Sequence, residues 1–219
     1  MVLAQDDRTT CPQQVTSFSG VAENGLQLRW GDHLANVLSQ IGSPPVLAVA
    51  MAGLCAAHSH EAGAWRWAAI HAGLTVAIPI VILVWLVARG TVSDLDVRHR
   101  EQRVGPMLAA LLGSAVSLAL LSLGQAPQLL VSIGLATYLQ LLLLFSITLQ
   151  WKISVHTTAA ASFTVLMCSL AGATALPFGG LILLVAWARV RLKRHTLAQT
   201  SAGALLGSLT MIIALTLGR

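Results

Sequence analysis

Apolar residues fill seven long segments of the chain, and polar residues gather between them. The segments cover residues 36–57, 66–88, 106–124, 127–150, 155–173, 177–190 and 197–217. A membrane-spanning helix needs about 20 mainly apolar residues, and most of these segments provide them. Pro44 and Pro45 interrupt the first segment, and the sixth is short. The pattern therefore predicts an all-α, polytopic integral membrane bundle of six to seven transmembrane helices.

The segments are joined by short connections, and the chain begins with a polar stretch. Gly124 to Pro127 and Leu176-Pro177 are tight turns, which favour antiparallel neighbouring helices. Residues 1–33 carry six acidic or basic side chains and no apolar core of a signal peptide. We therefore expect a polar N-terminal tail over 1–33 and one transmembrane domain over 34–219.

Composition supports a membrane protein. The 219 residues are 56% hydrophobic and only 10% charged, whereas a soluble domain carries about 25% charged residues. Cys11, Cys55 and Cys168 are widely spaced, so we interpret them as packing residues and not as a disulfide or a metal site. The high isoelectric point, about 9.9, indicates membrane topology or anion binding, and no nucleic-acid partner is expected.

The basic residues are distributed unevenly between the two sides that seven spans would create. Of the 13 Lys and Arg residues, only Arg66 and Arg219 fall on the side that holds the 58–65 loop. The other side holds Arg8, Arg29, Arg89, Arg98, Arg100, Arg103, Lys152, Arg189, Arg191, Lys193 and Arg194. Because cytoplasmic loops are enriched in Lys and Arg, we expect an inner-membrane protein with this face in the cytoplasm.

Three polar clusters lie on that cationic face, at residues 93–106, 152–156 and 189–199. Long cations at helix ends often snorkel to the membrane surface, and this explains Arg98, Arg191, Lys193 and Arg194 without any function. His156 and His195 require another explanation, because each stands beside Arg or Lys at the end of an apolar span. The cations would neutralise the phosphate oxygens, one histidine would attack the phosphorus, and the other would protonate the leaving group. Together these residues would form a phosphate-handling site.

Residues 90–210 resemble the type 2 phosphatidic acid phosphatase (haloperoxidase-like) superfamily. Arg189 and His195 match the spacing of its third signature, Ser-Arg, five residues, His, and the glycine-rich stretch 202–207 is similar to its continuation. Ile153-Ser154-Val155-His156 resembles the second signature, Pro-Ser-Gly-His. The cluster at 94–106 is a weaker counterpart of the first signature.

The resemblance implies a membrane lipid-phosphate phosphatase, a phosphoric monoester hydrolase acting on a phospholipid or polyprenyl (pyro)phosphate monoester. In that scheme His195 becomes phosphohistidine, His156 protonates the leaving oxygen, and Gln199 stands where the family has the aspartate that orients the nucleophile. No metal or cofactor is needed, and the partners are the lipid substrate and membrane lipids. The phosphate ligands would be Arg189, Lys152, Ser154, Arg103 and Arg100, with Asp94 and Asp96 in support.

The chain departs from the family pattern at several positions. Gln199 offers a carbonyl to the imidazole but no charge to stabilise an imidazolium. Val155 replaces the glycine of the second signature, and Asp96 stands where the first signature has lysine. These departures indicate either a divergent branch with a rewired first motif or a weak or lost activity.

Two other functions stay open. Part of the 93–106 cluster is faintly similar to the Asp-rich first motif of intramembrane prenyltransferases, which bind diphosphate through Mg²⁺; the residues are Asp94, Asp96, Arg100, Arg103 and Pro106. The 189–199 loop supplies no second acidic motif. A non-catalytic lipid-binding scaffold of the same fold would explain Val155 and Gln199.

Overall fold

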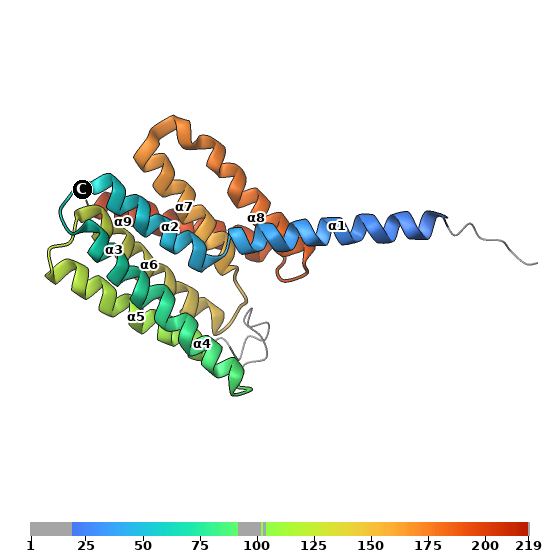
Figure 1. The fold of residues 1–219 in the computed structure, drawn as a ribbon, viewed down its shortest axis with the longest axis horizontal. Coiled ribbons are helices and arrows are strands. Elements are labelled where there is room, and N and C mark those ends of the chain that lie inside the picture. The colour runs from blue at the N-terminus through green and yellow to red at the C-terminus, as the bar shows by residue number, and fades with distance from the viewer. Residues whose placement is uncertain (1–18, 92–101, 103, 219) are drawn as a thin grey trace, which may run out of the picture.

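The computed structural model describes residues 19–91, 102 and 104–218, with side chains from residue 30 onward. The described part is built of helices and contains no strand (Figure 1). The predicted all-α class is confirmed. The elements are α1 (Ser19–Ile41), α2 (Pro44–Ser59), α3 (Ala64–Ala72), the π-helical turn η1 (Gly73–Ala77), α4 (Ile78–Ala88), α5 (Val104–Leu123), α6 (Gln128–Thr148), α7 (Val155–Ala171), the 3₁₀ turn η3 (Gly172–Phe178), α8 (Gly179–Arg191) and α9 (Leu197–Leu217).

Five helical runs among the described residues are long and apolar enough to cross a membrane. They are Ala64–Ala88, Val104–Leu123, Gln128–Thr148, Val155–Arg191 and Leu197–Leu217. Trp30–Ile41 and Pro44–Ser59 make a sixth if the pair, bent by 42°, is one span. The upper prediction of seven is not reached, because η3 joins α7 and α8 into one run of 37 residues. Helix α8 nevertheless turns back beside α7 (Figure 1).

The boundary between the predicted N-terminal tail and the first predicted apolar segment differs from the expectation. Helix α1 begins at Ser19 and runs through the expected boundary at residue 33 before it ends at Ile41. Helix α2 then starts with Pro44 and Pro45 in its first turn, where proline is tolerated because the N–H groups of a first turn have no partner within the helix. The two prolines therefore separate α1 from α2 instead of kinking one helix.

The chain reverses at two ends of the bundle (Figure 1). The turn at 60–63, the turn at 124–127 and residue 218 lie at one end, and the ends of α4, α6 and α8 lie at the other. We call the second the cationic end; its described basic residues are Arg89, Lys152, Arg189, Arg191, Lys193 and Arg194. The helices thus gather these cations at one end, as the charge pattern predicted.

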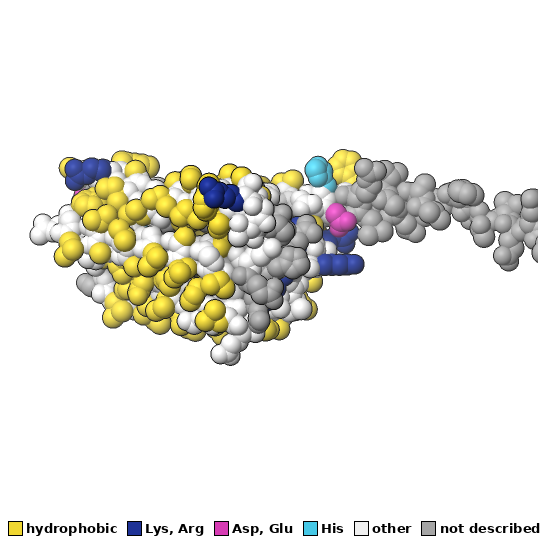
Figure 2. Space-filling view, turned by 90° about the horizontal axis from the view of Figure 1, so that it is seen from below, with side chains coloured by type: hydrophobic (Ala, Val, Ile, Leu, Met, Phe, Trp, Pro, Cys, Tyr) yellow, Lys and Arg dark blue, Asp and Glu magenta, His cyan; other side chains and the backbone are white. Residues whose placement is uncertain are grey.

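Much of the described surface is apolar. Figure 2 shows many hydrophobic side chains on the face seen from below, and large side chains such as Val81, Leu112 and Leu183 are exposed. At the cationic end the guanidinium of Arg89 lies 4.4 Å from the ring centre of Trp85. Tryptophan beside arginine is typical of the membrane–water boundary. Apolar length and surface together define an α-helical integral membrane protein.

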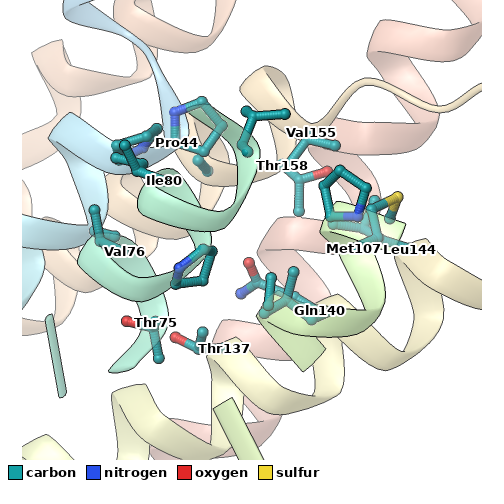
Figure 3. Close-up of a pocket in the computed structure, with 18 of the residues that line it drawn as sticks. Pro44, Thr75, Val76, Ile80, Met107, Thr137, Gln140, Leu144, Val155 and Thr158 are labelled. Carbon is teal, nitrogen blue, oxygen red and sulfur yellow. The ribbon is translucent and has the colours of Figure 1, made fainter. Parts of the chain in front are cut away.

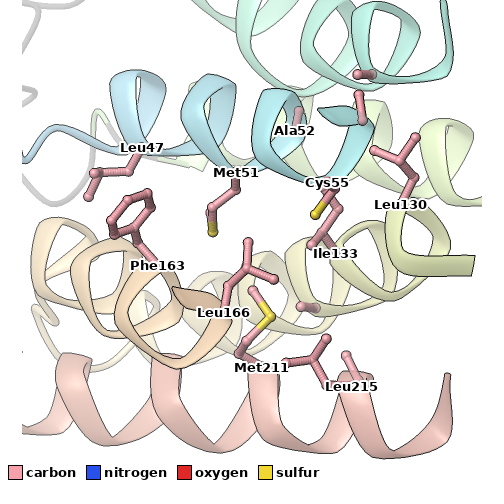
Figure 4. Close-up of a cluster of buried hydrophobic side chains, with 14 of the residues drawn as sticks. Leu47, Met51, Ala52, Cys55, Leu130, Ile133, Phe163, Leu166, Met211 and Leu215 are labelled. Carbon is pink, nitrogen blue, oxygen red and sulfur yellow. The ribbon is translucent and has the colours of Figure 1, made fainter. Parts of the chain in front are cut away.

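The core lies where α2, α6, α7 and α9 meet (Figure 4). Met51 and Cys55 of α2 face Ile133 of α6, Leu166 of α7 and Met211 of α9, and all five side chains are buried. Cys55 is buried in this core, as expected of a packing residue. Cys168 is partly exposed, and Cys11 lies outside the described residues.

Helices α7 and α9 touch through small residues. A methyl group added at Gly207 would meet the Thr158 backbone, and one at Gly203 would meet the Ser154 carbonyl. The Ser162 hydroxyl donates to the Gly207 carbonyl at 3.0 Å. Small residues allow helices in membranes to approach closely and to hydrogen-bond across the contact. This contact fixes the start of α7 against the start of α9.

Replacing Gly207 by alanine should therefore separate the two helices. We expect Gly207→Ala to lower the free energy of unfolding in detergent by about 1–3 kcal/mol, the usual range for overpacking, because the atoms it meets are backbone. Gly180→Ala in α8 is the matched control, since a methyl group there meets nothing within 4 Å. Equal effects of the two substitutions on thermal unfolding would contradict the close contact.

Candidate functional site

A reversed turn between α8 and α9 carries His195 back over Arg189. The N–H groups of Arg194 and His195 both donate to the Arg189 carbonyl, at 2.9 and 3.2 Å, and Lys193 donates to the Val190 carbonyl at 2.9 Å. Lys193 has a φ of +53°, the left-handed conformation that ends many helices in this way. The turn explains the spacing of six residues between Arg189 and His195. The side chains of both are buried.

The Gln199 side chain sets the proton position on His195. Its Oε1 accepts from the Thr196 N–H at 3.2 Å and lies 3.1 Å from His195 Nδ1. Because a backbone N–H can only donate, Oε1 is identified as the oxygen, and Nδ1 must donate to it. Nδ1 of His195 therefore carries a proton, and in the neutral form of the ring the lone pair is on Nε2. Such a ring can act as a nucleophile or a base.

The Arg189 side chain joins α8 to α7 and α1. Its Nη1 donates to the Ser39 hydroxyl at 2.9 Å and lies 3.4 Å from His156 Nε2. A guanidinium has donors only, so Nε2 accepts and the proton of neutral His156 is on Nδ1. Arg189 is only 3% exposed. One residue thus holds His156 with its side chain and His195 with its carbonyl.

Helices α7 and α9 begin side by side at this cluster. The Ser154 hydroxyl caps α7 by accepting the Thr157 N–H at 3.4 Å, and Thr196 caps α9 by accepting the Gln199 N–H at 3.3 Å. The Ser154 N–H donates to the Gln199 carbonyl at 3.3 Å, which ties the two starts together. Helix N-termini attract anions through their N–H groups and dipole. Two of them beside buried Arg189 favour an anionic group.

The structure thus brings five predicted residues together: His156, His195, Gln199, Arg189 and Ser154. Ser154 differs from expectation in one respect, because it is completely buried and its oxygen caps α7. Lys152 lies just before this cap and is half-buried. Arg103, Arg100, Asp94 and Asp96 lie outside the described residues.

Sequence reasoning missed Ser39. It belongs to a different predicted segment, far from the three polar clusters, and a lone serine in an apolar run carries no signal of its own. The one feature of the sequence that points to Ser39 is its position shortly before the Pro44-Pro45 break. Its bond to Arg189 makes the end of α1 part of the cluster.

The charged side chains described at this end of the bundle are mostly positive. An ion pair joins Arg191 to Asp32 at 3.1 Å, and both of its side chains are partly exposed. No group of three His, Cys, Asp or Glu residues suited to a metal ion occurs among the residues with described positions. The groups at this cluster that suit an anion are Arg189 and the two helix starts, with the imidazoles of His156 and His195 beside Arg189.

Comparison of the chain with protein-family models, with curated proteins and with solved structures finds no match. The class that fold and surface define is an α-helical integral membrane protein with a histidine–arginine cluster at its cationic end.

Proposed function

We propose that the chain is a lipid-phosphate phosphatase, a divergent relative of the type 2 phosphatidic acid phosphatases. The observation that carries this proposal is the double role of Arg189, whose guanidinium bonds His156 and whose carbonyl holds the His195 N–H. Phosphoryl transfer through a histidine requires an attacking nitrogen, a proton donor and a cation around one phosphorus atom. These three residues are the ones that the sequence resemblance assigns to those tasks.

The reaction has two steps. His195 Nε2 attacks the phosphorus of a phosphate monoester, an N–P bond forms, and the P–O bond to the lipid breaks. In the substrate complex Arg189 donates to the phosphate oxygens in place of His156 Nε2, and a protonated His156 gives its proton to the departing lipid oxygen. Water, deprotonated by His156, then breaks the N–P bond and releases inorganic phosphate. Arg189 neutralises the charge that the phosphoryl oxygens carry in both steps.

Gln199 distinguishes this site from one with an aspartate. It holds the productive tautomer of His195 through Nδ1, but it does not stabilise the positive charge that the ring acquires after attack. We therefore propose a working but slow enzyme. The substrate is a phospholipid or polyprenyl (pyro)phosphate monoester, because the cluster lies at one end of an apolar bundle, at the level where the headgroups of membrane lipids lie.

Replacing each histidine by alanine should distinguish the role of His195 from that of His156. With a lipid phosphate monoester, His195→Ala should abolish turnover and His156→Ala should lower kcat by about two to four orders of magnitude. Activity should survive EDTA. His58→Ala is the matched control, because His58 is exposed near the end of α2, away from the cluster. Strict Mg²⁺ dependence, lost in Asp94→Ala, would favour the prenyltransferase-like reaction, and an inactive wild-type protein would favour the scaffold.

We further propose that the cationic end faces the cytoplasm of a cell with an inner membrane, because positively charged loops are retained there. Single cysteines at Thr91 and Ala62, both exposed and at opposite ends of the bundle, test this in a chain whose own cysteines are replaced. An impermeant maleimide on intact cells should label Ala62→Cys and spare Thr91→Cys. The reverse labelling would contradict the orientation and would mean that the cations serve the substrate alone.

A further inference from the structure

A partly open apolar cavity of about 260 Å³ lies between α2, η1, α4, α5, α6 and α7 (Figure 3). Its wall is mostly hydrocarbon, from residues such as Val76, Met107, Leu144 and the surface-exposed Ile80. An apolar space of this kind suits an apolar guest and not a polar one.

The polar side chains on the wall are already bonded within the protein. The hydroxyl groups of Thr75, Thr137 and Thr158 each donate to the carbonyl group four residues earlier in the chain, at 2.7, 2.8 and 3.0 Å. The Gln140 amide donates to the Ser162 hydroxyl at 2.8 Å. Because these donors already have acceptors within the protein, they do not need a polar ligand as a hydrogen-bond partner.

Proline residues shape the cavity. Pro79 has no N–H to donate to the Thr75 carbonyl, and the Ile78 N–H instead reaches back five residues to Gly73. The resulting π-helical turn η1 is wider than an α-helical turn, and its Thr75 and Val76 line the cavity. Such turns occur often at functional sites. Pro44 and Pro106, each at the start of a helix, complete the rim.

The cavity adjoins the histidine–arginine cluster. Val155, Thr158 and Ala159 form the α7 side of its wall, and His156, one residue after Val155, lies 3.4 Å from Arg189. On the α1–α2 side, Pro44 lines the cavity and Ser39 bonds Arg189. Cavity and cluster therefore share the first turn of α7 and the junction of α1 with α2.

From this placement we infer that the cavity holds one hydrocarbon chain of the lipid whose phosphate occupies the cluster. The inference rests on the proposed function. A cavity of about 150 Å³ accepts a benzene molecule, so one of 260 Å³ takes a segment of one chain and not two chains side by side. Because the membrane is itself apolar, the cavity gains little affinity from hydrophobicity. It selects single-chain substrates and positions their phosphate.

Filling the cavity tests this. Ala48 of α2 and Ala110 of α5 line the cavity. Ala48→Phe and Ala110→Phe should therefore lower kcat/KM for farnesyl monophosphate by about tenfold to a hundredfold, because the phosphate of a displaced substrate is misplaced at the cluster. The kcat/KM for butyl phosphate, whose chain is too short to need the cavity, should stay within about twofold. Ala119→Phe, on the exposed side of α5, is the matched control and should change neither. Thermal unfolding verifies that all three variants fold.

Equal losses on both substrates, or no loss on either, would overturn the inference while leaving the phosphatase proposal intact. A wild-type protein that hydrolyses neither substrate would refute the proposed function instead. Chain binding is then tested without turnover, by a farnesyl monophosphate analogue with a photoreactive diazirine at the end of its chain. Crosslinks to Met107 or Leu144 that disappear in Ala110→Phe would support the cavity as a chain site. Crosslinks only to exposed residues would overturn it.

Discussion

The close contact between α7 and α9 is the constraint on which the rest of the site depends. Gly203 and Gly207 let the α9 backbone lie against Ser154 and Thr158, closer than any side chain would permit. The starts of the two helices are therefore level, and the Ser154 N–H reaches the Gln199 carbonyl. His156 and His195 stand beside these two starts, so their common position is a consequence of backbone packing, and both helix dipoles point their positive ends at the same place.

Arg189 connects the packed starts of α7 and α9 to the two histidines. A buried guanidinium near a membrane is costly unless it is bonded, and in this chain its bonds reach His156 and Ser39. The same residue ends α8 in a left-handed turn that delivers His195. Gln199 then fixes the ring so that the lone pair is on Nε2. The apolar cavity borders the same first turn of α7, so the site that we propose would have a polar end and an apolar one, as a lipid phosphate does.

Hydropathy predicted the helices well, because a membrane span is specified by local composition alone. The last segment, 197–217, matches α9 at both ends, and the break at Pro44-Pro45 occurs as expected. The spacing of Arg189 and His195 predicted their meeting, since a helix end and one turn determine it. Ser39 and the cavity escaped prediction because they arise from contacts between segments distant in sequence. Helix α8 turns back beside α7, as the tight turn at Leu176-Pro177 indicated, but the sequence did not predict that the turn itself is the 3₁₀ element η3.

The central claim is that His195 accepts the phosphoryl group, and a trapped phosphoenzyme tests it most directly. The wild-type protein would be mixed with a lipid phosphate labelled in its phosphoryl group, quenched in alkali, which spares an N–P bond, and digested for mass spectrometry. Our account predicts a phosphate group on His195 that is lost in acid and disappears in His195→Ala. Release of inorganic phosphate in the first turnover with no phosphate group on His195, or with one on another residue, would contradict it.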